Sequence, residues 1–149
     1  MSHSFKSRSA LTDALLRIVP EAAEFQWSRA ELDAQQAQAL AAEEKLDEAV
    51  SLYQASIHQK EELVRRSPDA VHWKLALGKS FAPLALIYEK AGDFDEAAAV
   101  FRKGIDILQS LENNAEVAEE VAVALQSSYF QMSSHMLQRI LVHRNPNYD

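Results

Sequence analysis

Apolar residues recur at helical spacing along nearly the whole chain, in long segments rich in Ala, Leu, Glu, Gln and Lys with few β-branched runs. Turn-forming residues interrupt this pattern at 19–20, 66–69, 91–93 and 113–114, and less sharply at 43–45. The pattern predicts a short helix over 9–19 and longer helices over 20–42, 46–66, 68–90, 94–112 and 115–143.

Two of these helix ends carry recognisable signals. Ser67-Pro68-Asp69 predicts the start of a helix, since Ser can cap and Pro at the first helical position has no N–H to leave unbonded. Gly92 predicts the end of the helix over 68–90. Pro83 lies well inside that helix and should bend or split it, together with Gly78, unless the segment 80–83 begins a second helix.

An internal repeat appears when the sequence is shifted by 48 residues against itself. Matches run along the whole unit, and the same shift places the start and end of the chain inside further copies. The clearest equivalent pairs are Pro20 and Pro68, Ala37 and Ala85, Leu40 and Tyr88, Ala49 and Ala97, Tyr53 and Phe101, Ile57 and Ile105, and Leu63 and Leu111.

The second copy resembles the tetratricopeptide repeat. Its residues Phe81, Leu84, Ala85, Tyr88, Gly92, Ala97, Phe101 and Gly104 stand at the spacings of that family's pattern. The resemblance implies an all-α fold, a right-handed α-α superhelix of about five to six antiparallel helices, in which Ala85 and Ala97 allow close helix packing and the ring of Phe101 or Tyr53 fills the layer between. The unit is longer than the usual 34 residues, like the long bacterial variety of these repeats. The first copy departs from the pattern, with Asp33 and Gln36 in place of Phe81 and Leu84.

The repeat suggests one domain over 9–143, between a disordered tail at 1–8 and a C-terminal tail at 144–149. Within it, repeat 1 spans about 20–66, repeat 2 about 68–112, and a C-terminal half-repeat helix covers 115–143. A chain of 149 residues is long enough to bury one hydrophobic core.

Composition narrows the classes of function. With 22 acidic against 15 basic residues the net charge is −7, which argues against nucleic acid and anionic membranes as partners. The polar N-terminus shows no secretory signal, and the chain has no Cys, which fits a cytoplasmic protein. The stretch 121–138 is long enough to span a membrane but too polar to do so.

Signatures of catalysis or cofactor binding are missing from the sequence. It contains no nucleophile elbow, no zinc-protease motif and no glycine-rich phosphate loop. His135 and His143 lie eight residues apart on one helix, too far to chelate a metal without another ligand. We therefore expect neither catalytic residues nor a metal or cofactor, and a protein that is not an enzyme.

The resemblance implies a concave surface on the first helix of each repeat that binds a protein or peptide. Its positions map to Glu31, Ala34, Gln38, Lys79, Ala82, Leu86, Glu89, Ser127, Phe130, Ser134 and Leu137. Only Lys79 fits the family's carboxylate clamp, so that ligand is not expected. Phe130, Leu137 and Leu86 suggest an apolar groove, although simple helix packing would give the same pattern.

The last predicted helix carries two apolar stripes. One runs through Val117, Val121, Leu125, Met132, Met136 and Ile140, and the other through Val123, Phe130, Leu137 and Leu141. One stripe can pack on repeat 2, while the other offers a surface for a partner or a second copy. Three functions remain open: a binding module or scaffold, a self-assembling homo-oligomer that uses this helix, or a sensor of a small molecule or peptide.

Overall fold

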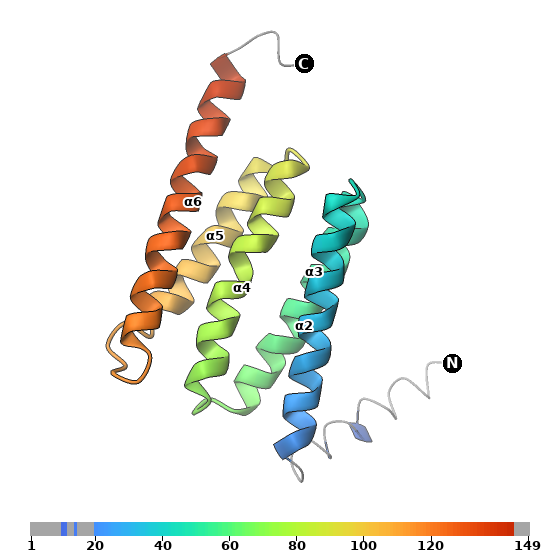
Figure 1. Cartoon of the computed structure of the whole chain (residues 1–149), viewed down its shortest axis with the longest axis vertical. Helices are drawn as coiled ribbons and strands as arrows, with labels where there is room; N and C mark the ends of the chain where they lie inside the picture. The colour runs from blue at the N-terminus through green and yellow to red at the C-terminus, as the bar shows by residue number, and fades with distance from the viewer. Residues whose placement is uncertain (1–9, 12–13, 15–19, 145–149) are drawn as a thin grey trace.

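The chain folds as a row of antiparallel helices. The structure, a computed structural model, describes residues 10–11, 14 and 20–144. Five helices lie between Pro20 and Arg144 (Figure 1): α2 (Pro20–Ala42), α3 (Leu46–Arg66), α4 (Val71–Lys90), α5 (Phe94–Gln109) and α6 (Ala118–Arg144). No strand occurs among the described residues. The predicted all-α, repeat-like fold is therefore confirmed. The predicted tail at 1–8 and most of the predicted helix over 9–19 lie outside the described residues.

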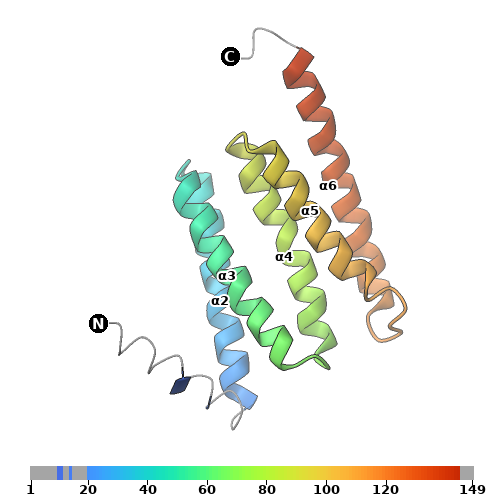
Figure 2. The same cartoon turned by 180° about the vertical axis from the view of Figure 1, so that it is seen from behind.

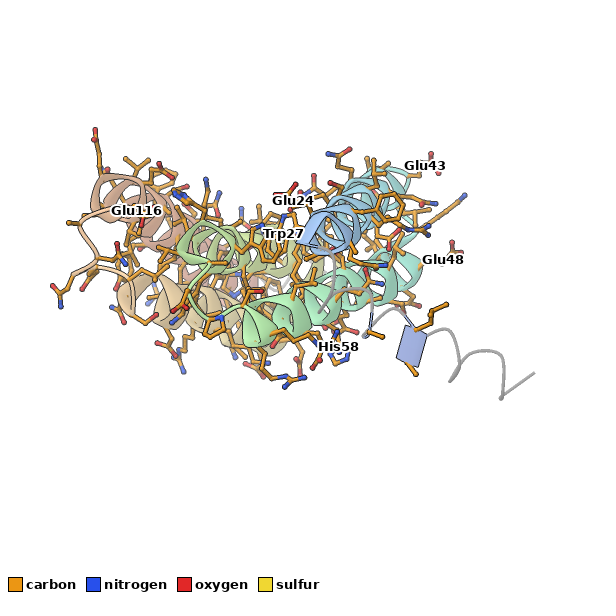
Figure 3. All side chains as sticks on the ribbon, turned by 90° about the horizontal axis from the view of Figure 1, so that it is seen from below. Glu24, Trp27, Glu43, Glu48, His58 and Glu116 are labelled. Carbon is orange, nitrogen blue, oxygen red and sulfur yellow. The ribbon has the colours of Figure 1, made fainter. Side chains whose placement is uncertain are left out.

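The helices form two layers. In Figure 1, α2, α4 and α6 lie nearer the viewer. In Figure 2, which shows the molecule from behind, α3 and α5 lie nearer the viewer. Each helix packs mainly on its neighbours in the chain, with weaker contacts between α2 and α4 and between α4 and α6. Seen along the helices in Figure 3, α2 and α6 rise on either side of α4. The layer of α2, α4 and α6 is therefore the concave side of the row.

The turns after α2 and α4 have the same structure. The amide of Asp93 donates to the carbonyl of Tyr88 at 2.9 Å, and the amide of Lys45 donates to that of Leu40 at the same distance. Gly92, with φ 83°, ends α4 as predicted. Its equivalent Glu44 adopts the same left-handed backbone, with φ 64°. These two turns, 48 residues apart in the sequence, therefore have the same backbone structure.

The predicted start of α4 is wrong by three residues. Ser67 does not cap α4, because its amide donates to Leu63 and Val64 and closes α3 instead. The segment 67–70 is a turn, in which the amide of Ala70 donates to the carbonyl of Ser67. A residue before Pro avoids helical backbone angles, which favours this turn.

The helices over 94–112 and 115–143 were also predicted too long, since residues 110–117 form the connection between α5 and α6. Arg144, predicted to lie in a tail, is the last residue of α6.

Pro83 does not split α4. The helix is continuous from Val71 to Lys90, so no second helix begins at residue 80. Because Pro83 has no N–H, the bond it would have made within the helix is missing. Packing on both sides of α4 explains how the helix tolerates this loss, since α3 and α5 both contact it and Phe81, Leu84 and Ala85 are buried.

The core follows the positions that repeat along the chain. Ala49 and Ala97 are fully buried, and the rings of Tyr53 and Phe101 are buried beside them. A second cluster joins α4 and α5 to the start of α6, around Leu108, Val117 and Val121. Their burial stabilises the fold by about 25 cal/mol per Å² of apolar surface. None of the described helices has an apolar stretch long enough to cross a membrane.

Candidate partner-binding surfaces

Two clefts open on the concave side of the molecule. One lies between α2 and α4 and has a volume of about 310 Å³. The other lies between α4 and α6 and has a volume of about 500 Å³. Lys79 and Pro83 of α4 line both clefts. The two clefts are therefore neighbouring parts of one groove that crosses α4.

A buried lysine forms the floor of the cleft between α2 and α4. The side chain of Lys60, on α3, is almost completely buried, and its Nζ lies 2.5 Å from Oε1 of Glu31. The same Nζ donates to Oγ of Ser80 at 3.3 Å and lies 5.4 Å from the centre of the Trp27 ring. A buried ammonium is tolerated only where such partners replace its lost hydration.

Aromatic rings hold α2 against α4 beside this lysine. Trp27 of α2, labelled in Figure 3, stacks on Trp73 of α4 with ring centres 5.3 Å apart. Tyr53 donates its hydroxyl to the carbonyl of Ser80 at 2.7 Å. Burial, and to a lesser extent the negative charge of Glu31, raise the pKa of Tyr53 well above its ordinary value, so this phenol stays neutral.

The cleft between α4 and α6 is more apolar. Ala82 contributes one wall, Val123 and Ala124 contribute the other, and Glu119 and Glu120 lie at the start of α6 beside it. Oε1 of Gln131, which also lines this cleft, is buried without a hydrogen-bond partner. This oxygen is an acceptor that a ligand with an N–H or O–H group could satisfy.

The residues predicted for the site fall into three groups. Six of them line the groove: Glu31, Ala34, Gln38, Lys79, Ala82 and Ser127. Glu89 is engaged inside the protein, because its Oε2 lies 2.8 Å from Nδ1 of His135. The others line neither cleft and are exposed on the surface of α4 or α6: Leu86, Phe130, Ser134, Leu137 and Leu141.

His135 has a structural place in the fold. Its ring is buried between Phe94 and Phe101, with Nδ1 on Glu89 and Nε2 3.2 Å from the carbonyl oxygen of Phe94. Both nitrogens thus face oxygen atoms on α4 and α5, which fixes the middle of α6 against repeat 2. No group of three or more His, Asp or Glu residues suited to a metal ion occurs among the described residues.

Sequence reasoning missed both Lys60 and His135 as organising residues. The shift by 48 residues places Lys60 on Leu108 and His135 on Ile87, so each is a polar residue at a position that is buried and apolar in repeat 2. That mismatch was the available signal. The partners Glu31 and Glu89 lie far away in sequence, however, and only the fold brings them together.

The two stripes on α6 have different surroundings. Val117, Val121 and Leu125 of the first stripe are buried, whereas Met136 and Ile140 further along it are exposed. All members of the second stripe, Val123, Phe130, Leu137 and Leu141, are exposed. Figure 1 shows that the last part of α6 extends beyond the turn between α4 and α5. Simple packing within repeat 2 therefore accounts for only one stripe.

Comparison with known proteins agrees with this architecture. Residues 80–115 match the family model of the tetratricopeptide repeat, a segment that runs from the middle of α4 through α5. No curated protein is significantly similar to the chain. No solved structure is significantly similar to it either. The match thus supports a tetratricopeptide repeat at residues 80–115, in the hairpin α4–α5.

Proposed function

We propose that the protein is a non-enzymatic binding module that holds an extended segment of a partner protein across its concave groove. Tetratricopeptide repeats generally serve protein–protein interaction. The observation that carries the proposal is the pair of clefts that meet at Lys79 and Pro83, since a peptide that crosses α4 can occupy both. Clefts of this size each accommodate a few side chains.

The groove favours a particular kind of segment. Lys79 is exposed and makes no ion pair with any described residue, so it is available to a carboxylate of the partner. Ala82, Val123 and Ala124 present apolar surface to a side chain in the larger cleft. Gln131, whose Oε1 has no hydrogen-bond partner among the described residues, also lines this cleft. These features suit a segment in which an acidic residue adjoins an apolar one.

The test is selection of binding peptides from a displayed library, followed by titration of the selected peptides. Lys79→Glu should weaken their binding about tenfold, because it replaces an attractive charge by a repulsive one. Val123→Asp should weaken it by a similar factor, since it places a charge against an apolar side chain. Helical content measured by circular dichroism checks that both variants fold.

Lys103→Glu is the matched control. It makes the same change of charge at an exposed position of α5, in the opposite layer. Peptide binding should therefore be retained in this variant. If Lys79→Glu and Val123→Asp bind the selected peptides as well as the unaltered protein does, the groove is not the binding site and the proposal is wrong.

A further inference from the structure

The outer face of α6 carries a second apolar pattern, of which only Val123 also lines the groove. Val123, Phe130 and Leu137 are spaced seven residues apart and are 63%, 73% and 57% exposed. Three residues after each of them lie Gln126, Ser133 and Ile140, which are also exposed. This alternation of three and four residues is the spacing by which one helix packs along another.

This face of α6 is exposed because the helix packs on α4 and α5 with its opposite side. Val121, Leu125 and Ser128 on the opposite side are buried, and α6 packs on α5 and α4. In the register of 48 residues, Tyr129, Ser133 and Met136 correspond to Phe81, Ala85 and Tyr88, all of which are buried in repeat 2. Within residues 20–144, no helix covers the equivalent face of α6.

We propose that a second copy of this chain covers this face, with the two α6 helices antiparallel about a twofold axis. The charges at the two ends of α6 are opposite in sign, so the helix is complementary to a second copy of itself in the antiparallel orientation. Glu119 and Glu120 lie in the first turn, and His143 and Arg144 lie in the last. Antiparallel pairing brings acidic and basic ends together, whereas parallel pairing would place like charges side by side.

In one alignment of the two antiparallel helices, large side chains face small ones and acidic residues face basic ones. When the axis passes between residues 131 and 132 of each helix, the large ring of Phe130 lies opposite the small Ser133 of the other copy. Val123 then lies opposite Ile140, and Gln126 opposite Leu137. At both ends, Glu119 comes opposite Arg144. Each facing pair therefore occurs twice, once on each side of the axis, as a twofold interface requires.

The pair overlaps the groove only at one end. Phe130 and Leu137 line neither cleft, whereas Val123 and Glu119 also line the larger cleft, so the cleft between α2 and α4 remains accessible in the dimer. The inference is independent of the proposed function, because a monomer could still bind peptides and a dimer need not. The variants that test dimer formation, at Phe130 and Leu137, are therefore chosen outside the groove.

The first experiment measures the molecular mass by size-exclusion chromatography with light scattering over a wide range of concentration. We expect a dimer, at twice the chain mass of 16.7 kDa. Phe130→Asp and Leu137→Asp should each raise the dissociation constant about a hundredfold while the helical circular dichroism is retained. Phe25→Asp is the matched control, since Phe25 is 61% exposed on α2 and should leave the dimer intact.

The second experiment tests the register. Glu119→Arg and Arg144→Glu should each weaken the dimer, and the double variant should restore it, because the opposite charges again face each other. The chain has no cysteine, so introduced thiols report proximity without background. A mixture of Gln126→Cys and Leu137→Cys chains should form a disulfide between copies, while Gln126→Cys alone should not.

Some results would overturn the inference. A monomer at every concentration would contradict it, as would a dimer that Phe130→Asp and Leu137→Asp leave unchanged. A dimer weakened by these variants but not restored by the double charge exchange would exclude the antiparallel register. A monomer that binds another protein through Phe130 would show that the face serves a different partner, and the proposal of a second copy would then be wrong.

Discussion

The hairpins α2–α3 and α4–α5 have the same frame but different interiors. Their turns share equivalent hydrogen bonds, and the alanines and rings at equivalent positions are buried in both. In α4–α5 the interior is apolar, with Leu75 and Leu108 buried. In α2–α3 the equivalent positions hold Trp27 and Lys60, and the lysine is paired with Glu31.

The two hairpins also differ at the point where the paired helices of each lie closest together. A Cβ atom on Gly104 would lie 2.8 Å from the carbonyl oxygen of Gly78, so no larger residue fits. The equivalent Ser56 in the first hairpin donates its Oγ to the carbonyl of Ala30 at 2.5 Å. One hairpin thus brings its helices together by removing a side chain, and the other by a buried hydrogen bond.

The difference teaches that this repeat specifies backbone geometry more strictly than interior chemistry. The match to the family model covers residues 80–115, in the hairpin whose interior is apolar. The polar hairpin keeps the fold, but it needs partners from neighbouring helices, such as Ser80 of α4, to satisfy its buried groups. Exchanging residues between equivalent positions tests this difference directly.

The largest effect is expected when the buried lysine is introduced into the apolar hairpin. Leu108→Lys should destabilise the protein by about 4 kcal/mol or more, because the position equivalent to Glu31 is Lys79, which repels the new charge. Urea unfolding followed by circular dichroism measures this change.

Lys60→Leu makes the opposite exchange and serves as its control. Glu31 remains partly exposed and can be hydrated, so the free energy of unfolding should change by only about 1 kcal/mol. If the two exchanges cost the same, the interiors of the hairpins are chemically equivalent and the contrast drawn here is wrong.

The next effect concerns the close approach of the helices. Gly104→Ala should cost about 2 to 3 kcal/mol, because its Cβ would meet backbone rather than a movable side chain. Ser56→Ala should cost about 1 kcal/mol, the contribution of one hydrogen bond. Thermal unfolding of both variants gives the order, and a larger loss for Ser56→Ala would contradict it.

Tyr53 should make the first hairpin sensitive to alkaline pH. Its pKa is raised in the folded protein, so above about pH 10, where unfolded Tyr ionises, the unfolded state loses a proton that the folded state keeps. Stability from this group is therefore complete below pH 10 and lost above it. Tyr53→Phe, which copies Phe101, should cost about 1 kcal/mol at neutral pH and reduce the alkaline loss.

Urea midpoints of the two proteins between pH 7 and 11 provide the measurement. The pKa of Tyr88 is also raised, mainly by its burial, and this residue remains in both proteins, so some alkaline loss persists. Equal loss in both proteins would show that Tyr53 is not responsible.

The smallest effect is expected at the turns. Glu44→Gly should stabilise the protein by about 0.5 to 1 kcal/mol, since glycine adopts the left-handed backbone at little cost. The gain is reduced by loss of the exposed ion pair with Lys90. Gly92→Ala should be destabilising by a similar amount. Melting temperatures that move the same way in both variants would contradict this account.

Much of the fold could be predicted from the sequence because its turns are marked locally. Both ends of α2 and α3 agree with prediction, and Gly92 fixed the end of α4. The start of α4 was wrong because Ser67 and Pro68 suit either a helix start or a turn, and only the bonds that close α3 decide between them.

The candidate site was less predictable. The resemblance to the family implied that Gln38 and Lys79 belong to the groove, and both line it. It could not show that Glu89 is engaged by His135, or that Lys60 forms the floor of a cleft, since these contacts join helices distant in sequence. Exposure of Phe130 and Leu137 likewise depends on what α5 covers.

Packing between chain neighbours has a consequence for how the protein unfolds. All contacts between the five described helices join helices that are consecutive or next but one, so α2 and α6 do not touch. Such an arrangement favours fast folding and lets the end helices open before the centre does. Amide protons of α4, which contacts all four other helices, should accordingly exchange more slowly than those of any end helix.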